Sequence, residues 1–358
     1  MNWGLWWAQI KSVIRLEMRK TFFAKRGIWV YLLALAPAAL FFADSIAVIH
    51  DRDRRADEAT THPITRDKIG EVKMGMTKDE VVEKLGEPYA KQVFKFNRRR
   101  EQHEQAIYRY TDGESDYVYM FRDDELNGIR TNELRTIPKD SLIFATVFQF
   151  FFLRLAIFFG CVGIFTNLFR GELLDKSLHF YLLAPIRREV LLVGKYLAGL
   201  IATVVIFTTS TALQLLAMGW HLTGPAMTEY LHGPGMSQIG AYLGVTALAC
   251  LGYGSVFLAA GLVFRNPIIP AAVVLLWESA NPFLPATLKK ISVIFYLQSM
   301  CPVVARPNDM PALAALLLSS AEATPAIWAA GGLVVVTMVL LALAARQARK
   351  LEINYSSD

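Results

Sequence analysis

Long apolar runs alternate with charged stretches along this chain of 358 residues. An apolar helix of about twenty residues crosses the hydrocarbon core of a bilayer, so such runs are candidate spanning helices. The chain therefore predicts an all-α polytopic membrane protein. We expect six transmembrane helices, at about 28–49, 141–168, 190–220, 239–264, 268–285 and 326–345.

The fifth run is the shortest of the six. Lys289 and Lys290 follow it, and then comes a second short apolar run at 291–304, broken by Pro302. This pattern fits one span followed by a segment that dips into the membrane or lies on its surface. Residues 221–238 contain no Lys or Arg, which is typical of an external loop.

Residues 51–140 form the polar interruption between the first two spans. Thr77 and Glu80 fit a capping box at the start of a helix that ends near Gly86. Strand-like alternation follows at 106–110 and 116–121, with turn residues after each run. We expect a small α+β extracytoplasmic domain here.

Basic residues outside that domain indicate the topology. Lys and Arg cluster before the first span, in the short loops expected inside, and after the last span, which places both termini in the cytoplasm. Residues 1–26 interleave Trp with Lys and Arg, a pattern typical of an amphipathic helix in contact with membrane lipid. The positive charge thus reports topology, and we expect no nucleic-acid partner. The domain boundaries predicted are 1–50, 51–140 and 141–358.

A second polar interruption, at 169–195, follows the second span. Leu174, Leu178 and Leu182 form one row at helical spacing, and Pro185 ends the pattern. Arg187 and Arg188 then precede the next span. This amphipathic segment is either a cytoplasmic surface for a partner or an ordinary helix lying on the bilayer.

Catalytic motifs are absent from the sequence. The chain contains no Gly-x-x-x-x-Gly-Lys-Ser/Thr loop, no His-Glu-x-x-His and no Gly-x-Ser-x-Gly, so we expect neither an enzyme nor a metal site. Arg154 and Glu278 are the notable charged residues within the predicted spans. A charge at mid-bilayer costs about 2.5–3.5 kcal/mol on insertion scales. We expect the two residues to pair across the bundle near a substrate route, or else to form a purely structural ion pair or leave Arg154 snorkelling to an interface.

Residues 69–131 resemble the SmpA/OmlA (BamE-like) family of small outer-membrane lipoproteins. The resemblance rests on GMTKDEVVEKLGEP and YRYTDGESDYVYMFRDDELNGI. It implies the fold of that family and a disposition to bind an extracytoplasmic protein through residues 60–135. The lipidated cysteine of the family is missing, so its role in barrel assembly does not transfer.

The remaining sequence, about 1–49 and 141–358, resembles the ABC-2-type permeases of ABC transporters. The matching features are Glu172, the leucines that follow it, Pro185-Ile-Arg-Arg188 and Gly194-Lys195. The amphipathic N-terminal segment and the broken segment before the last span also match. The large domain between the first two spans is a departure from the minimal family.

The resemblance implies that residues 172–183 form a coupling helix that docks into a separate cytoplasmic ABC ATPase. That partner would carry ATP and Mg²⁺, and this chain would bind no cofactor. A permease homodimer or heterodimer in a bacterial inner membrane would then export a substrate that the sequence does not specify. The residues expected to serve the coupling are Glu172, Leu174, Leu178, Leu182, Pro185 and Arg188. The alternative is a non-transporting membrane scaffold whose external domain recruits envelope proteins.

Overall fold

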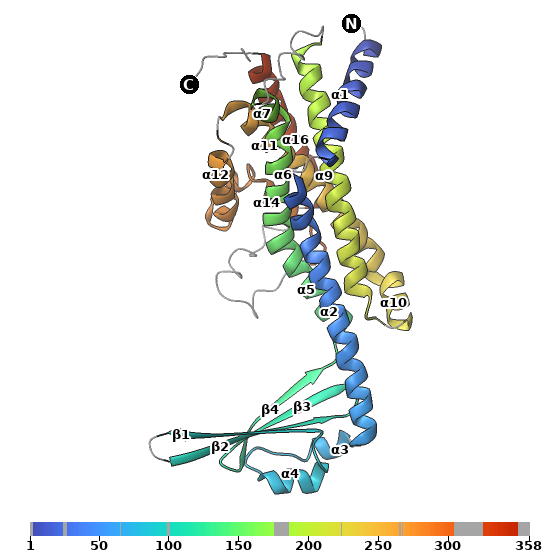
Figure 1. Cartoon of the computed structure of the whole chain (residues 1–358), viewed down its shortest axis with the longest axis vertical. Helices are drawn as coiled ribbons and strands as arrows, with labels where there is room; N and C mark the ends of the chain where they lie inside the picture. Colours follow the sequence, from blue (N-terminus) through green and yellow to red (C-terminus); the bar gives the residue numbers. More distant parts are fainter. Residues whose placement is uncertain are drawn as a thin grey trace. The chain divides into compact units, whose positions relative to one another are not determined.

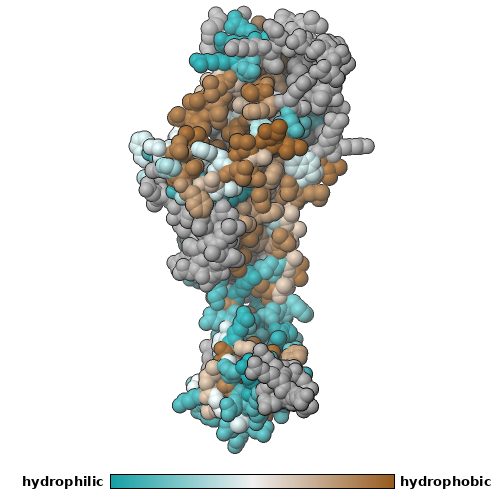
Figure 2. All heavy atoms as spheres, turned by 90° about the vertical axis from the view of Figure 1, so that its left-hand side faces the viewer, coloured by the Kyte–Doolittle hydropathy of each residue, from teal (hydrophilic) through white to brown (hydrophobic). Residues whose placement is uncertain are grey.

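The computed structural model divides the chain into two compact units (Figure 1). The helical unit comprises Met1–Phe42 and Asp140–Asp358, and the sheet unit comprises Ala43–Lys139. The structure describes residues 3–23, 27–64, 66–98, 101–174, 186–222, 224–264, 266, 268–303 and 325–349. Figure 2 shows mainly apolar side chains on the visible surface of the helical unit and mainly polar ones on the sheet unit.

Helices α1 and α2 begin the chain, and the other helices of the helical unit follow the sheet. The first two are α1 (Trp3–Phe23) and α2 (Ile28–Thr61). After the sheet come α5 (Ile137–Val147), the π-helix η2 (Phe148–Ile157), α6 (Phe158–Phe165), α7 (Asn167–Leu174) and α9 (Arg188–Gly219). They are followed by α10 (Gly224–Tyr230), the π-turn η3 (Leu231–Gly235), α11 (Met236–Val263), α12 (Ile268–Ser279), the 3-10 turn η4 (Asn281–Phe283), α13 (Ala286–Lys289), α14 (Val293–Ser299) and α16 (Ala326–Arg349).

Within the described residues, five helical stretches are long and apolar enough to cross a membrane. They are Ile28–Thr61, Ile137–Phe169, Arg188–Gly219, Gly224–Val263 and Ala326–Arg349. These stretches fit a multi-pass membrane protein and match five of the six predicted spans. The span expected at 268–285 is not confirmed, because α12 has 12 residues and is about 18 Å long. Pro282 and Pro285 break the chain after it into short helices, in the region where the sequence predicts a broken segment.

Two features around the start of the fourth predicted span differ from the sequence-based expectation. The expected external loop at 221–238 is largely helical, because α10 and η3 lead directly into α11 across a kink at Gly233. The four-residue spacing of Gly240 and Gly244 is a weak signal for close helix packing, but both have open space within this chain where a Cβ would lie. Gly254 makes the close approach instead: a Cβ there would come within 2.5 Å of the Phe165 ring.

The sheet unit contains four antiparallel strands in the order β1-β2-β3-β4. They are β1 (Ala90–Arg98), β2 (Glu101–Thr111), β3 (Ser115–Arg122) and β4 (Glu125–Glu133), with α3 (Arg66–Ile69) and α4 (Lys78–Leu85) before them. The capping box is confirmed: Thr77 accepts from the Glu80 backbone N–H, and the Glu80 carboxylate accepts from the Thr77 N–H. Val81 and Leu85 of α4 join the buried tyrosines Tyr108, Tyr110 and Tyr119 in one core.

Helix α2 does not end at the predicted domain boundary near residue 50. It continues to Thr61, and its residues from Ala43 onward belong to the sheet unit. Arg55 donates to Asp51 Oδ2 at 2.8 Å and to the Asn132 carbonyl at 2.7 Å. The first contact lies within α2, and the second holds the charged last turns of α2 on the sheet.

Candidate functional site

The predicted coupling segment begins in α7 and ends at the start of α9. Glu172 and Leu174 lie in the last turns of α7, and Arg188 is the first residue of α9. The other predicted coupling residues, Leu178, Leu182 and Pro185, lie outside the described residues. The surroundings of this segment therefore come from the two helices that flank it.

The start of α9 is fastened to the end of α16. Arg188 Nη1 donates to the backbone carbonyl of Arg349 at 2.6 Å, and Arg349 Nε lies 2.6 Å from Glu189 Oε1. A carboxylate in the first turn of one helix and a guanidinium in the last turn of another are each favoured by the helix dipoles. These contacts fix the start of α9, the first described helix after the predicted coupling segment.

Lys195, about two turns further along α9, is fully buried and joins three helices. Its Nζ lies 2.7 Å from Glu17 Oε1 of α1 and donates to the Leu168 carbonyl of α7 at 2.8 Å. The same ammonium lies 5.4 Å from the centroid of the Phe169 ring. Neither charge of the pair reaches solvent, since the side chains of Lys195 and Glu17 are 0% and 4% exposed. We call Lys195, Glu17 and Leu168 the lysine junction.

Gly194 allows the close approach that the lysine junction needs. A Cβ at this position would lie 2.8 Å from Val13 Cγ1, so α1 contacts the backbone of α9 directly. Arg187 stacks over the Trp6 ring at 4.9 Å, nearer the start of both helices. Helix α1 therefore lies along the N-terminal half of α9, as Figure 1 shows.

The lysine junction links both flanks of the predicted coupling segment to the N-terminal helix. Leu168 lies before the segment, Lys195 lies after it, and Glu17 belongs to neither. A buried ion pair with several hydrogen bonds holds its partners in one geometry, because separating them leaves a charge in a low-dielectric interior. The lysine junction therefore holds α1, α7 and α9 to one another.

Sequence reasoning identified Gly194-Lys195 only through the family resemblance and missed Glu17. A signal was present, since Glu17 is the single acidic residue among the first 26 residues, which contain six Lys or Arg. A lone carboxylate in a basic amphipathic helix is a candidate for a specific buried partner.

Glu278 and Arg154 lie together in the interior of the helical unit, and both are buried. The Glu278 carboxylate accepts from the backbone N–H groups of Val293 and Ile294 at 3.0 and 2.8 Å, and from Ser292 Oγ at 2.9 Å. It therefore caps the start of α14 from the end of α12, satisfying donors that the short helix leaves open.

Arg154 approaches this cluster from η2. Its Nη1 donates to the backbone carbonyl of Glu278 at 3.4 Å. The π-helix widens the second span at this point, and π-helical turns often occur at functional sites. Arg154 and Glu278 are therefore neighbours, as expected, and the Glu278 carboxylate accepts hydrogen bonds from Tyr253, from Ser292 and from the start of α14.

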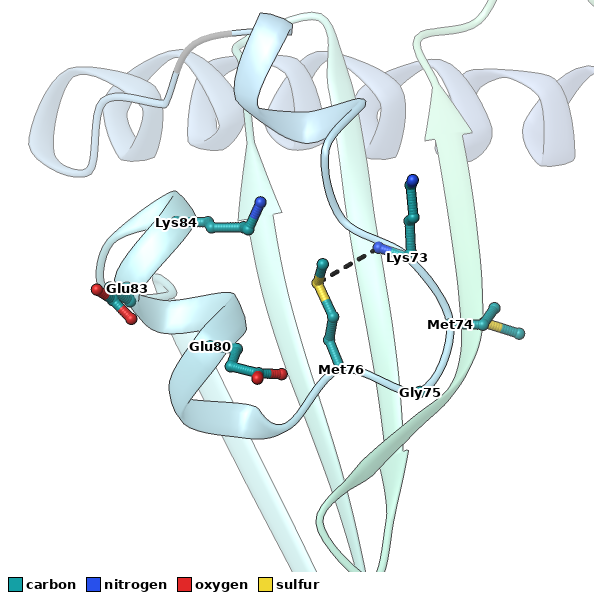
Figure 3. A pocket seen from close by; sticks show the side chains of 7 residues that line it. All are labelled: Lys73, Met74, Gly75, Met76, Glu80, Glu83 and Lys84. Atoms are coloured by element: carbon teal, nitrogen blue, oxygen red, sulfur yellow. Dashed lines mark hydrogen bonds between the residues drawn. The ribbon is translucent and has the colours of Figure 1, made fainter.

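The sheet unit has a hollow of about 630 Å³ between residues 73–76 and α4 (Figure 3). Two of its four charged side chains have structural roles: Glu80 serves the capping box and Lys84 lies 3.2 Å from Glu71. Met74 on its rim is largely exposed. The hollow offers a mixed polar and thioether surface and no arrangement of an acid, a base and a nucleophile among its described residues.

No protein-family model, curated protein or solved structure matches this chain. In the described ranges, His, Cys, Asp and Glu side chains form no group of three or more that is suited to a metal ion. The helical unit therefore offers two sites for functional interpretation, the lysine junction and the Glu278 cluster.

Proposed function

We propose that this chain is the membrane-spanning permease subunit of an ATP-driven exporter of the ABC-2 type. Its partner would be a cytoplasmic ABC ATPase that docks on the segment 172–183 and carries ATP and Mg²⁺. A second permease chain, identical or not, would complete the transport unit in a bacterial inner membrane. The sequence supports an external energy source, because it contains no phosphate-binding loop.

The observation that carries this proposal is the lysine junction. Leu168 of α7 and Lys195 of α9, which lie on either side of segment 172–183, are tied to each other and to α1 by one buried ammonium. An ATPase docked on this segment would transmit its motion through these anchored helices. The contacts of Arg188 and Glu189 with Arg349 extend the anchored region to α16.

The second candidate function is a membrane scaffold whose sheet unit recruits envelope proteins. The observation in its favour is the exposure of apolar side chains on the sheet unit, where Met74, Val93 and Phe94 are 61%, 49% and 52% exposed. Exposed apolar surface of this kind is typical of protein-binding sites.

Hydrolysis of ATP in reconstituted vesicles separates the two functions. The chain and its co-purified ATPase are placed in liposomes, and phosphate release is measured with phospholipids, peptides and hydrophobic drugs as test substrates. An exporter couples substrate binding to the ATPase, so at least one class should raise the rate several-fold, consistent with coupling energies of about 1–3 kcal/mol. Equal rates with every class, at a measurable basal rate, would contradict export and favour the scaffold.

A further inference from the structure

An apolar groove of about 500 Å³ lies between α11, α12 and α16. Ala260 and Ala344 lie at buried positions along it and are 8% and 2% exposed. Val263, Val273 and Leu343 also line it and are 58%, 61% and 51% exposed. The groove is therefore open along its side while its deeper part is closed by small residues.

The lining of the groove is apolar except for Gln347. This glutamine lies in the last turn of α16, where Arg346 and Arg349 are the basic residues. Arg346 is exposed and lies three residues after Leu343, so its side chain leaves the helix within one turn of the groove. The groove itself is apolar along its length, and the exposed Arg346 lies on the neighbouring turn of α16 at one end.

Such a groove in a multi-pass membrane protein is filled by something apolar. Protein and lipid pack without voids of this size, because an unfilled space forfeits the dispersion contacts of its walls. An acyl chain fits an apolar, side-open groove, and a basic site at the end of membrane helices attracts an anionic headgroup.

The alternative occupant, a second copy of the chain, is disfavoured by charge. A two-fold axis through this groove would bring the cationic ends of two α16 helices onto the same interface. Like charges at an interface are costly, and no carboxylate is among the residues that line the groove. We propose that the groove binds one acyl chain of an anionic phospholipid, with the phosphate beside Arg346. This site is independent of the proposed ATPase coupling.

The test is native mass spectrometry of the purified full-length chain, titrated with phosphatidylglycerol or phosphatidylcholine. We expect one phosphatidylglycerol molecule to bind each chain more tightly than the further lipid molecules, which bind non-specifically. Val273→Trp should fill the groove and abolish this retention for both lipids. Arg346→Gln should lower the affinity for phosphatidylglycerol about fivefold, as expected for the loss of one cation near the headgroup. The affinity for phosphatidylcholine should not change.

Matched controls keep the test specific. Leu276→Trp places the same ring on α12 at a position that is 71% exposed and does not line the groove. Lys290→Gln removes a cation elsewhere in the helical unit. Both should retain lipid like the unaltered chain. The proposal is overturned if no lipid is retained above the statistical series, if the controls lose lipid equally, or if Val273→Trp dissociates a dimer, which would make the groove an interface between copies.

Discussion

Replacement of Lys195 by methionine is expected to destabilise the folded protein by about 3–5 kcal/mol, the usual cost of removing one partner of a buried ion pair. The substitution keeps the apolar stem but leaves the Glu17 carboxylate buried beside no cation, and it removes the donor to the Leu168 carbonyl. The measurement is thermal unfolding of the purified chain in detergent. We expect a large fall in Tm, or failure to accumulate in membranes.

The double variant Lys195→Met/Glu17→Leu makes this result specific. Replacing both charges of a buried pair with apolar groups of similar volume is often nearly neutral or stabilising, so most of the lost stability should return. Lys290→Met, at an exposed position, serves as the control and should leave Tm unchanged. If Lys195→Met matched that control, or if the double variant were less stable than either single variant, the lysine junction would not have the role described.

The second large effect is expected at Glu278. Glu278→Ala removes the acceptor for two backbone N–H groups and one hydroxyl at the start of α14. Each buried donor left without a partner costs about 1–3 kcal/mol, so α14 should detach from α12. Protection of the Val293 and Ile294 amides from hydrogen exchange measures this directly and should be lost.

Glu278→Gln is the matched control, because it retains an acceptor oxygen and removes only the charge. We expect it to keep most of the amide protection. The double reversal Arg154→Glu/Glu278→Arg should not restore protection, since an arginine accepts no hydrogen bond from α14. Recovery in the double reversal would show that the charge pair, and not the cap, holds this region.

The sequence predicts the parts of the fold that local rules determine. Thr77 and Glu80 define a helix start through a two-residue motif, and uninterrupted apolar runs define five long helices. The strand β1 is not predicted, because Lys91 and Lys95 interrupt its apolar positions. It forms through its backbone pairing with β2.

Long-range contacts account for the differences. Helix α2 continues past the predicted boundary because Arg55 finds acceptors on β4, some 77 residues away in sequence. The spacing of Gly240 and Gly244 carries no information about the facing helix, and both glycines have open space within this chain. The pairing of Glu17 with Lys195 joins residues 178 apart, and only the rarity of an acid in a basic segment indicates it.

The central claim is that the segment between α7 and α9 binds a separate ATPase. The direct measurement is purification of the tagged full-length chain from its native membranes, with quantification of co-purifying proteins that contain a phosphate-binding loop. The account predicts such an ATPase in stoichiometric amount. Leu178→Asp/Leu182→Asp should lower its recovery about tenfold or more, because two apolar anchors are lost. Val93→Asp/Phe94→Asp, which alters exposed residues of the sheet unit, should retain it. Absence of any such ATPase, or equal recovery with the Leu178→Asp/Leu182→Asp variant, would contradict the account.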